Sequence, residues 1–239
     1  GQITVFIIYI FIFRKKNYDI KMNFKNFRFD KSTVRKLYAV GLPSSIMLSM
    51  PSILISVLNG ILASISEVSV AVLGIYYKLQ TFVYMPTNGL IQGMRPIISY
   101  NYGAKQRDRV LNTIKISIML TSIIMIIGTC ISVFFPEKVL MMFNAHDNMM
   151  SMGSTALRII SIGFIISSGS VILSGTFEAL GDGKLSLIIS LVRQFIIIVP
   201  LALILSRVLG VNGVWVSFPI SEIAASIVSL ILFRKYEKL

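Results

Sequence analysis

The sequence is poor in charged residues, cysteine and histidine, and these shortages exclude several classes of protein before any pattern is considered. Only 14% of its 239 residues are charged, while 55% are hydrophobic. A soluble domain usually carries about a quarter charged residues, and a water-soluble fold could not bury so much apolar surface. The single cysteine, Cys130, lies inside an apolar run, so we expect neither a disulfide framework nor a Cys/His metal site.

Sequence signatures of enzymes are missing as well. The chain contains no Gly-x-Ser-x-Gly elbow, no phosphate-binding Walker loop and no His-Glu-x-x-His pair. We therefore predict that the protein is not an enzyme and has no catalytic residues, no metal and no organic cofactor.

The net charge of +13 could indicate nucleic-acid binding, but the basic residues lie mainly in the gaps between apolar runs. This arrangement does not form the aromatic-basic groove that RNA or DNA would need. Cationic loops beside apolar segments are typical of membrane proteins. We expect a lipid bilayer, and not nucleic acid, as the partner.

Long apolar runs make up most of the chain, and a transmembrane helix needs about 20 mostly apolar residues. Three runs contain no charged residue: 37–66, 116–136 and 159–177. Three further runs carry one or two charges each and are still long enough to span: 68–100, 185–206 and 212–233. The sequence therefore predicts an all-α integral membrane protein with a six-helix transmembrane lobe over residues 39–233.

Residues 1–13 are apolar but too short to cross a bilayer. They lack the basic start and the small-residue cleavage site of a signal peptide, so we interpret them as the C-terminal part of a truncated transmembrane helix. Residues 14–38 are predicted to form a basic cytoplasmic linker, and residues 234–239 a cytoplasmic tail.

The distribution of Lys and Arg predicts the orientation in the membrane. When the loops are assigned alternately to the two sides, seventeen of these residues fall on one side, and only Lys138 and Arg207 fall on the other. Loops rich in Lys and Arg face the cytoplasm, so both ends of the chain are expected there. The consistent alternation supports the six spans independently of hydropathy.

Four of the seven prolines fall in the middle of predicted spans: Pro51, Pro86, Pro200 and Pro219. Proline removes a backbone hydrogen bond and tends to kink a helix, and in a membrane the freed carbonyl must meet protein or water. One interpretation is that proline is simply common in membrane helices. The other, which four prolines in six spans favour, is a set of bent helices around a cavity.

The span over residues 68–100 is the most polar. Its polar side chains recur at spacings of three and four, which predicts a stripe along one side of a helix: Tyr77, Lys78, Gln80, Tyr84, Asn88, Gln92 and Arg95. A lysine inside a membrane is costly unless it meets a partner or water, so Lys78 is a candidate functional residue. The alternative is that its long side chain snorkels to the membrane surface.

Two further charges lie within the last two spans, Arg193 and Glu222. They could form a structural ion pair between packed helices or take part in a proton path. The sequence leaves both interpretations open.

Several segments resemble the MATE (multidrug and toxic compound extrusion) family of transporters. The runs YKLQTFVYMP at residues 77–86 and GMRPIISYNYGA at residues 93–104 are similar to that family's eighth helix and the loop after it. FEALGDGK at residues 177–184 resembles its turn between helices ten and eleven, and LGVNGVW at residues 209–215 its entry to helix twelve. GLPS at residues 41–44 resembles the start of helix seven.

The resemblance implies the C-terminal six-helix lobe of a twelve-helix transporter in a bacterial cell membrane, from the bacterial multidrug efflux branch. Such a transporter exports cationic, amphipathic drugs in exchange for sodium or protons, with the N-terminal lobe as the partner. Some branches carry coupling carboxylates in helices seven and ten, but residues 42–63 and 159–177 here contain no acid. The resemblance therefore implies that the coupling ion, sodium or proton, binds in the N-terminal lobe.

On this basis we expect the shared cavity to be lined by polar residues of the lobe: Asn59, Tyr77, Lys78, Gln80, Asn88 and Gln92. Two alternatives remain from the sequence. The first is a lipid-linked oligosaccharide flippase of the same superfamily, for which Lys78 and Arg95 would supply a basic cavity. The second is a non-functional truncated half.

Overall fold

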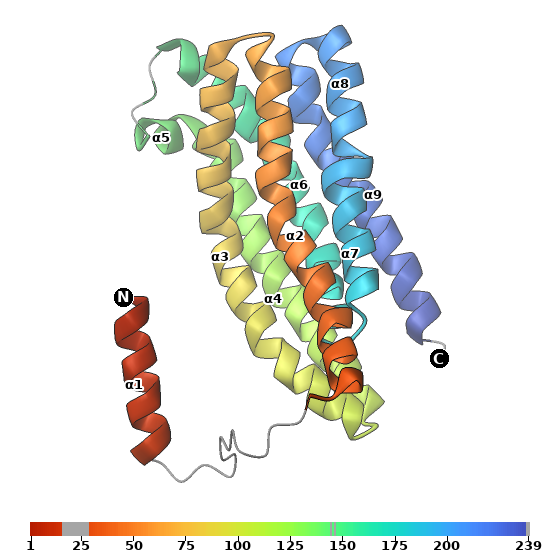
Figure 1. The fold of residues 1–239 in the computed structure, drawn as a ribbon. Helices are drawn as coiled ribbons and strands as arrows, with labels where there is room; N and C mark the ends of the chain where they lie inside the picture. The colour runs from red at the N-terminus through yellow and green to blue at the C-terminus, as the bar shows by residue number, and fades with distance from the viewer. Residues whose placement is uncertain (16–28, 144, 146, 238–239) are drawn as a thin grey trace. The chain divides into compact units, whose positions relative to one another are not determined.

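The computed structural model describes residues 1–15, 29–143, 145 and 147–237, and the regular structure in these ranges is helical (Figure 1). The chain divides into two compact units, residues 1–36 and residues 37–239. Helix α1 lies in the first. The helices are α1 (Gln2–Lys15), α2 (Lys31–Ala63), α3 (Glu67–Gly103), α4 (Arg107–Phe134), α5 (Pro136–Met141), α6 (Asp147–Ala179), α7 (Gly183–Leu191), the π-helical η2 (Val192–Ile196), α8 (Ile198–Leu209) and α9 (Val211–Glu237).

Six helical stretches of the described residues are long and apolar enough to cross a membrane. They are α2, α3, α4, α6, the continuous run α7–η2–α8, and α9. The predicted all-α fold with six transmembrane helices is therefore confirmed. α1 is apolar but shorter.

Two helices extend past the boundaries predicted from the sequence. α2 begins inside the segment 14–38 because Asp30 caps it: the carboxylate accepts hydrogen bonds from the backbone N–H groups of Ser32 and Thr33, at 3.0 and 2.9 Å. α9 continues to Glu237, so most of the predicted tail is helical. Residues 16–28 of the predicted linker lie outside the described residues.

α6 forms the centre of the lobe. It contacts α3, α4, α7 and α9, and it is the most buried of the spans. Side-chain hydroxyls tie its neighbours to it: Thr129 of α4 donates to the carbonyl of Ser161 at 2.8 Å, Ser122 of α4 to the hydroxyl of Ser168 at 3.0 Å, Ser226 of α9 to the carbonyl of Ile166 at 2.8 Å, and Ser99 of α3 to the carbonyl of Ala179 at 2.7 Å. Small residues and hydroxyl bonds of this kind hold helices together in lipid, where the hydrophobic effect contributes little.

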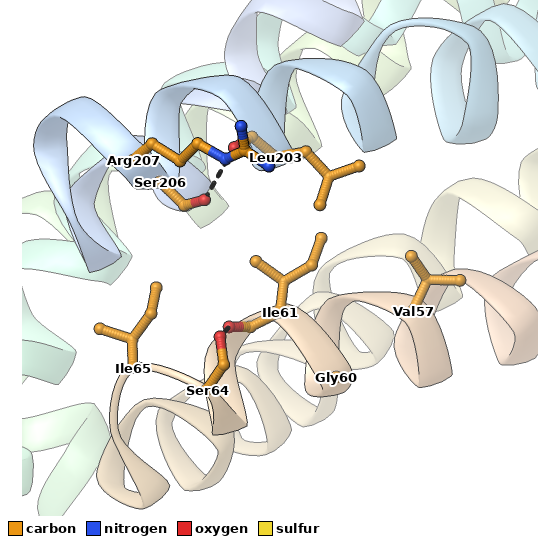
Figure 2. Close-up of a pocket in the computed structure, with 8 residues that line it drawn as sticks. All are labelled: Val57, Gly60, Ile61, Ser64, Ile65, Leu203, Ser206 and Arg207. Atoms are coloured by element: carbon orange, nitrogen blue, oxygen red, sulfur yellow. Dashed lines mark hydrogen bonds between the residues drawn. The ribbon is translucent and has the colours of Figure 1, made fainter.

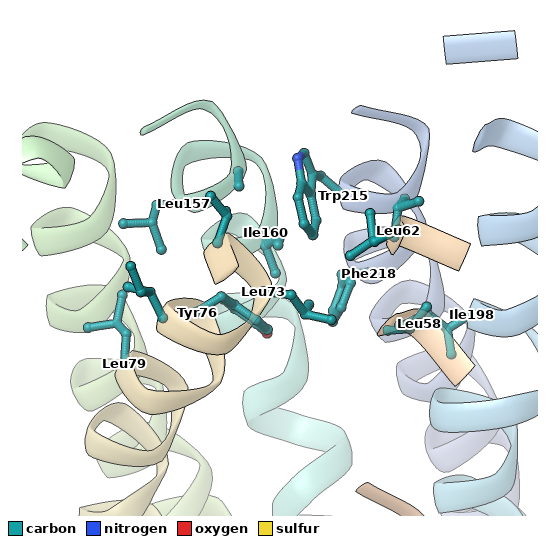
Figure 3. Close-up of a cluster of buried hydrophobic side chains, with 14 of the residues drawn as sticks. Leu58, Leu62, Leu73, Tyr76, Leu79, Leu157, Ile160, Ile198, Trp215 and Phe218 are labelled. Atoms are coloured by element: carbon teal, nitrogen blue, oxygen red, sulfur yellow. The ribbon is translucent and has the colours of Figure 1, made fainter. Parts of the chain in front are cut away.

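A cluster of buried apolar side chains joins α2, α3, α6 and α9 (Figure 3). Trp215 is completely buried within it. The Tyr76 ring lies edge-on to Phe218 at a centroid distance of 5.2 Å, a favourable aromatic geometry. A second cluster around Phe177 and Ile98 joins α3, α4, α6, α7 and α9. The two clusters join helices α2 to α9 into one packed body.

The fifth span is not a continuous α-helix. Its middle, η2, is π-helical, and Pro200 follows as the third residue of α8. π-Helical segments and proline both interrupt regular helical hydrogen bonding. Pro51, Pro86 and Pro219 lie inside α2, α3 and α9. Two prolines that were not predicted to kink a span also lie inside helices, Pro43 in α2 and Pro96 in α3.

Candidate functional site

The outward faces of the spans are of two kinds. Those of α4, α8 and α9 are apolar, and their most exposed large side chains include Ile116, Ile123, Ile127, Leu203, Ile204, Val208, Ile223, Ile227 and Ile231. Such a surface is suited to lipid tails, which offer no hydrogen-bonding partner.

α2 and α3 are joined by a short turn, run side by side in Figure 1, and present a different surface. On α3 the exposed positions form one continuous face of small and polar residues interspersed with Phe82 and Met85: Gly74, Lys78, Thr81, Asn88, Gly89, Gln92 and Gly93. On α2, exposed serines follow one another at spacings of three and four, flanked by Leu48 and Ile53: Ser45, Ser49, Ser52 and Ser56. We call this surface the α2–α3 wall.

The wall is open where its glycines lie. An added Cβ at Gly74, Gly89 or Gly93 would meet nothing within 4 Å. These glycines therefore do not serve close packing inside the lobe. They leave the middle of α3 accessible beside Asn88 and Gln92.

The structure divides the polar stripe predicted on α3 into two sets. Lys78, Asn88 and Gln92 are exposed on the wall, whereas Tyr77 and Gln80 are half-buried and turn toward the lobe. Asn59 of α2 is also half-buried. The six residues expected to line one cavity therefore do not share one face.

Lys78 reaches toward one end of the bundle. Its Nζ lies 5.7 Å from the centroid of the Phe143 ring, in the segment after α5. A cation over an aromatic face is a stabilising contact. This placement favours the snorkelling interpretation of Lys78 over a role in the middle of a cavity.

Arg95 forms an ion pair that the sequence did not predict. Its guanidinium donates to a carboxylate oxygen of Glu178 at 2.5 Å, and Ser186 of α7 donates to the other oxygen at 3.1 Å. The pair joins α3 to the end of α6 and the start of α7. Glu178 is thus a structural link between three helices.

Arg193 and Glu222 lie close enough to interact electrostatically, but among the described residues they form no ion pair. Oε2 of Glu222 is buried and has no hydrogen-bond partner. α6 packs closely against this side chain at Gly163, where an added Cβ would lie 3.4 Å from Cγ of Glu222. On the same side of the lobe interior, the Tyr84 hydroxyl is hydrogen-bonded to that of Ser167 at 2.7 Å.

No group of three or more His, Cys, Asp or Glu side chains that could hold a metal ion occurs in the described part of the chain. The site is therefore best described as a surface, the α2–α3 wall, backed by a polar interior around Glu222.

Comparison with known proteins shows which family has this architecture. The family model described as MatE matches residues 43–204. The chain belongs to the MatE family. This confirms the resemblance that the sequence carried at residues 41–44, 77–104 and 177–184.

Curated relatives include the multidrug export protein MepA of Staphylococcus haemolyticus, 23% identical over 95% of this chain and 50% of that protein. MepA of Staphylococcus aureus strain NCTC 8325 is 24% identical over 97% of the chain and 51% of its own length. This MatE chain therefore spans about half the length of the curated relatives it matches.

Solved structures share the fold. A multidrug resistance MATE family transporter in an outward-facing conformation superposes with a TM-score of 0.89 at 23% identity, over 99% of this chain and 53% of that one. A MOP superfamily transporter from Pyrococcus furiosus, described as having a binding pocket of reverse polarity, gives 0.90 at 21% identity, over 99% and 54%. The six-helix MatE lobe thus corresponds to half of a transporter of this fold.

Proposed function

We propose that this MatE chain is one lobe of a cation-coupled multidrug efflux transporter that exports cationic, amphipathic compounds. The contrast between the apolar outer faces and the α2–α3 wall carries this proposal. Asn and Gln side chains are costly in contact with lipid and usually face a bundle interior or a water-filled cavity. The wall is therefore the surface that meets a second lobe and the transported compound.

The chemistry of the wall fits a weakly selective passage. Amides of Asn88 and Gln92 can donate and accept hydrogen bonds, while the neighbouring Phe82 and Met85 are 69% and 68% exposed and offer apolar contact. Methionine adapts its shape to varied ligands. An amphipathic drug finds both kinds of partner on one helix.

Transport proceeds by rocking this lobe against its partner lobe, with the compound between them. The coupling ion, sodium or proton, binds in the partner lobe, because residues 42–63 of α2 and 159–177 of α6 contain no acidic residue. The bias of Lys and Arg toward one side supports an orientation with both ends of this chain on the cytoplasmic face of a bacterial cell membrane.

Thiol accessibility tests the wall in the full-length transporter. Cys130, the single cysteine of this chain, is first replaced by serine, as is any cysteine outside this chain. N88C and Q92C are then expected to react with a membrane-impermeant thiol reagent and to be protected by a transported drug. I123C on the apolar face of α4 is the control and stays unreactive, because it faces lipid.

Drug efflux from vesicles under imposed sodium and proton gradients tests the activity itself. Alanine at Asn88 and Gln92 together is expected to change the Michaelis constant for cationic dyes more than the maximal rate. Gradient-independent behaviour of every dye, or equal labelling of N88C and I123C, would contradict the proposal.

The flippase alternative receives less support from this lobe. It requires a basic cavity, but Lys78 extends to the Phe143 ring and Arg95 is neutralised by Glu178. Of the two cations on which that alternative depended, Arg95 is thus paired within the lobe, and Lys78, although exposed on the wall, holds its ammonium over the Phe143 ring.

A further inference from the structure

A groove with a cavity volume of about 470 Å³ lies between α2 and α8, near the ends of both helices (Figure 2). This volume is in the range of small-molecule sites. Apolar side chains face each other across it, and polar ones lie at the helix ends: Val57, Ile61 and Leu203, then Ser64, Ser206 and Arg207. Gly60 contributes no side chain, so the α2 side of the groove is low at that position.

Among the described residues, Arg207 is the polar group of this groove that has no hydrogen-bond or ion-pair partner. Both serine hydroxyls donate within their own helices, Ser64 to the carbonyl of Ile61 at 2.7 Å and Ser206 to that of Leu203 at 3.0 Å. Arg207 is exposed, and no described residue forms an ion pair or hydrogen bond with its guanidinium. Its five donors therefore remain available to a ligand.

The ligand chemistry follows from charge. α2 and α8 both end at the groove, and helix C-termini carry partial negative charge that repels anions. Arg207 must therefore supply the attraction for any anion there. A guanidinium binds the oxygens of a phosphate through two parallel hydrogen bonds, which an ammonium cannot do.

The length of the groove fits an amphiphile. From Ser64 back to Val57 it follows α2 for about 10 Å of helical rise, away from the end of the helix. A ligand with an anionic head at Arg207 would thus place an apolar chain along Val57, Ile61 and Leu203. In a bilayer the abundant molecule with this chemistry is a phospholipid.

We propose that this groove is a binding site for an anionic phospholipid, with the phosphate on Arg207 and one acyl chain between α2 and α8. The leaflet rests on the orientation argued under the proposed function: the lipid belongs to the external leaflet, where Arg207 and Lys138 are the basic residues of this chain. The Lys138 ammonium lies over the Phe135 ring at 5.2 Å, away from the groove. Lys138 is therefore a matched control of equal charge on the same side.

The test measures phosphatidylglycerol bound to purified full-length transporter, by native mass spectrometry and by titration of a fluorescent analogue. R207Q is expected to weaken binding about five- to tenfold, the loss of one charge-assisted contact, whereas K138Q leaves it unchanged. R207K keeps the positive charge but cannot form the two parallel hydrogen bonds of a guanidinium. Its affinity for phosphatidylglycerol is expected to lie between those of R207Q and K138Q.

G60L tests the apolar part of the site. Nothing lies within 4 Å of a Cβ at Gly60, so leucine enters the groove without disturbing the lobe and displaces the chain. Glycerol phosphate, which has the headgroup chemistry and no chain, is expected not to compete.

Four outcomes overturn the proposal: no phosphatidylglycerol bound by the unmodified transporter, equal loss in K138Q, full binding by G60L, or competition by glycerol phosphate. The first would mean that the rest of the transporter covers the groove, and the last that the site takes a free anion. The test measures lipid binding and not efflux. Its outcome therefore stays separate from the outcome of the drug-export experiments.

Discussion

Gly213→Ala is expected to destabilise the lobe at the turn between α8 and α9. Gly210, in this turn, has a φ of 60°, a conformation that favours glycine. A Cβ at Gly213 would lie 2.2 Å from the carbonyl oxygen of Leu205 and 2.3 Å from its carbonyl carbon. These are backbone atoms, so no side-chain rotation relieves the overlap, and one helix must move by most of an ångström. Overpacking of this kind costs about 3 kcal/mol.

The assay is the free energy of unfolding of full-length transporter in detergent, with Gly169→Ala as the control. Gly169 lies inside α6, away from the α2–α3 wall, and an added Cβ there meets nothing within 4 Å. That substitution removes a helix-interior glycine and is expected to be neutral or to stabilise by up to about 1 kcal/mol. Equal stability of the two variants would refute the argument that the α8–α9 turn requires a glycine for space.

Three further outcomes are expected. Neutralising either partner of the Arg95–Glu178 pair should cost about 1–3 kcal/mol, and a double-mutant cycle should recover part of this loss as coupling between the two residues; additive effects would show that the pair is not formed. Ser167→Ala removes the hydrogen-bond partner of the half-buried Tyr84 hydroxyl and should cost about 1 kcal/mol; in a Tyr84→Phe background, which lacks that hydroxyl, the same change should have almost no effect. Hydrogen bonds from Thr33 and Ser32 lower the pKa of Asp30 below its ordinary 3.8, so the cap stabilises α2 above that pH and is lost as pH falls through the lowered value; amide exchange in the first turn of α2 should accelerate there, and Asp30→Asn should blunt that pH response.

The spans could be predicted from the sequence because bilayer thickness imposes a length on any apolar run, and this signal is local. The site could be predicted only in part. Spacings of three and four identified a polar α3, but both Tyr77, which turns inward, and Gln92, which is exposed, fit such a stripe. Which side of α3 is buried depends on where α6 packs, and no periodicity within α3 contains that information.

The Arg95–Glu178 pair shows a second limit. Its members are 83 residues apart in the chain. Each charge can be explained from its local sequence alone, because Arg95 lies near the end of a predicted span and Glu178 precedes a turn. Only the packing of α3 on α6 brings them together. Glycine positions behave in the same way, since Gly74 and Gly213 are indistinguishable in sequence and differ completely in the space around them.

The bonds around α6 bear on how the lobe can move. α3, α4 and α9 each donate a side-chain hydroxyl to α6, and the Ser174 hydroxyl of α6 is bonded to that of Ser186 on α7 at 2.5 Å. Sliding any one of these helices past α6 would break such a bond in an environment without water to replace it. During the proposed transport cycle, the helices of the lobe are therefore expected to move as one body.

Thr129→Val tests this rigidity. It replaces the hydroxyl by a methyl of similar size and removes the bond to the carbonyl of Ser161, which is buried. The stability of the transporter is expected to fall by about 1 kcal/mol, since side-chain bonds between membrane helices average somewhat less than that and reach nearly twice it. Because the helices move together, the efflux rate at a temperature well below unfolding is expected to stay unchanged. A faster or slower rate at unaltered stability would show that α4 shifts against α6 during the transport cycle, and the lobe would then have to be divided into parts that move separately.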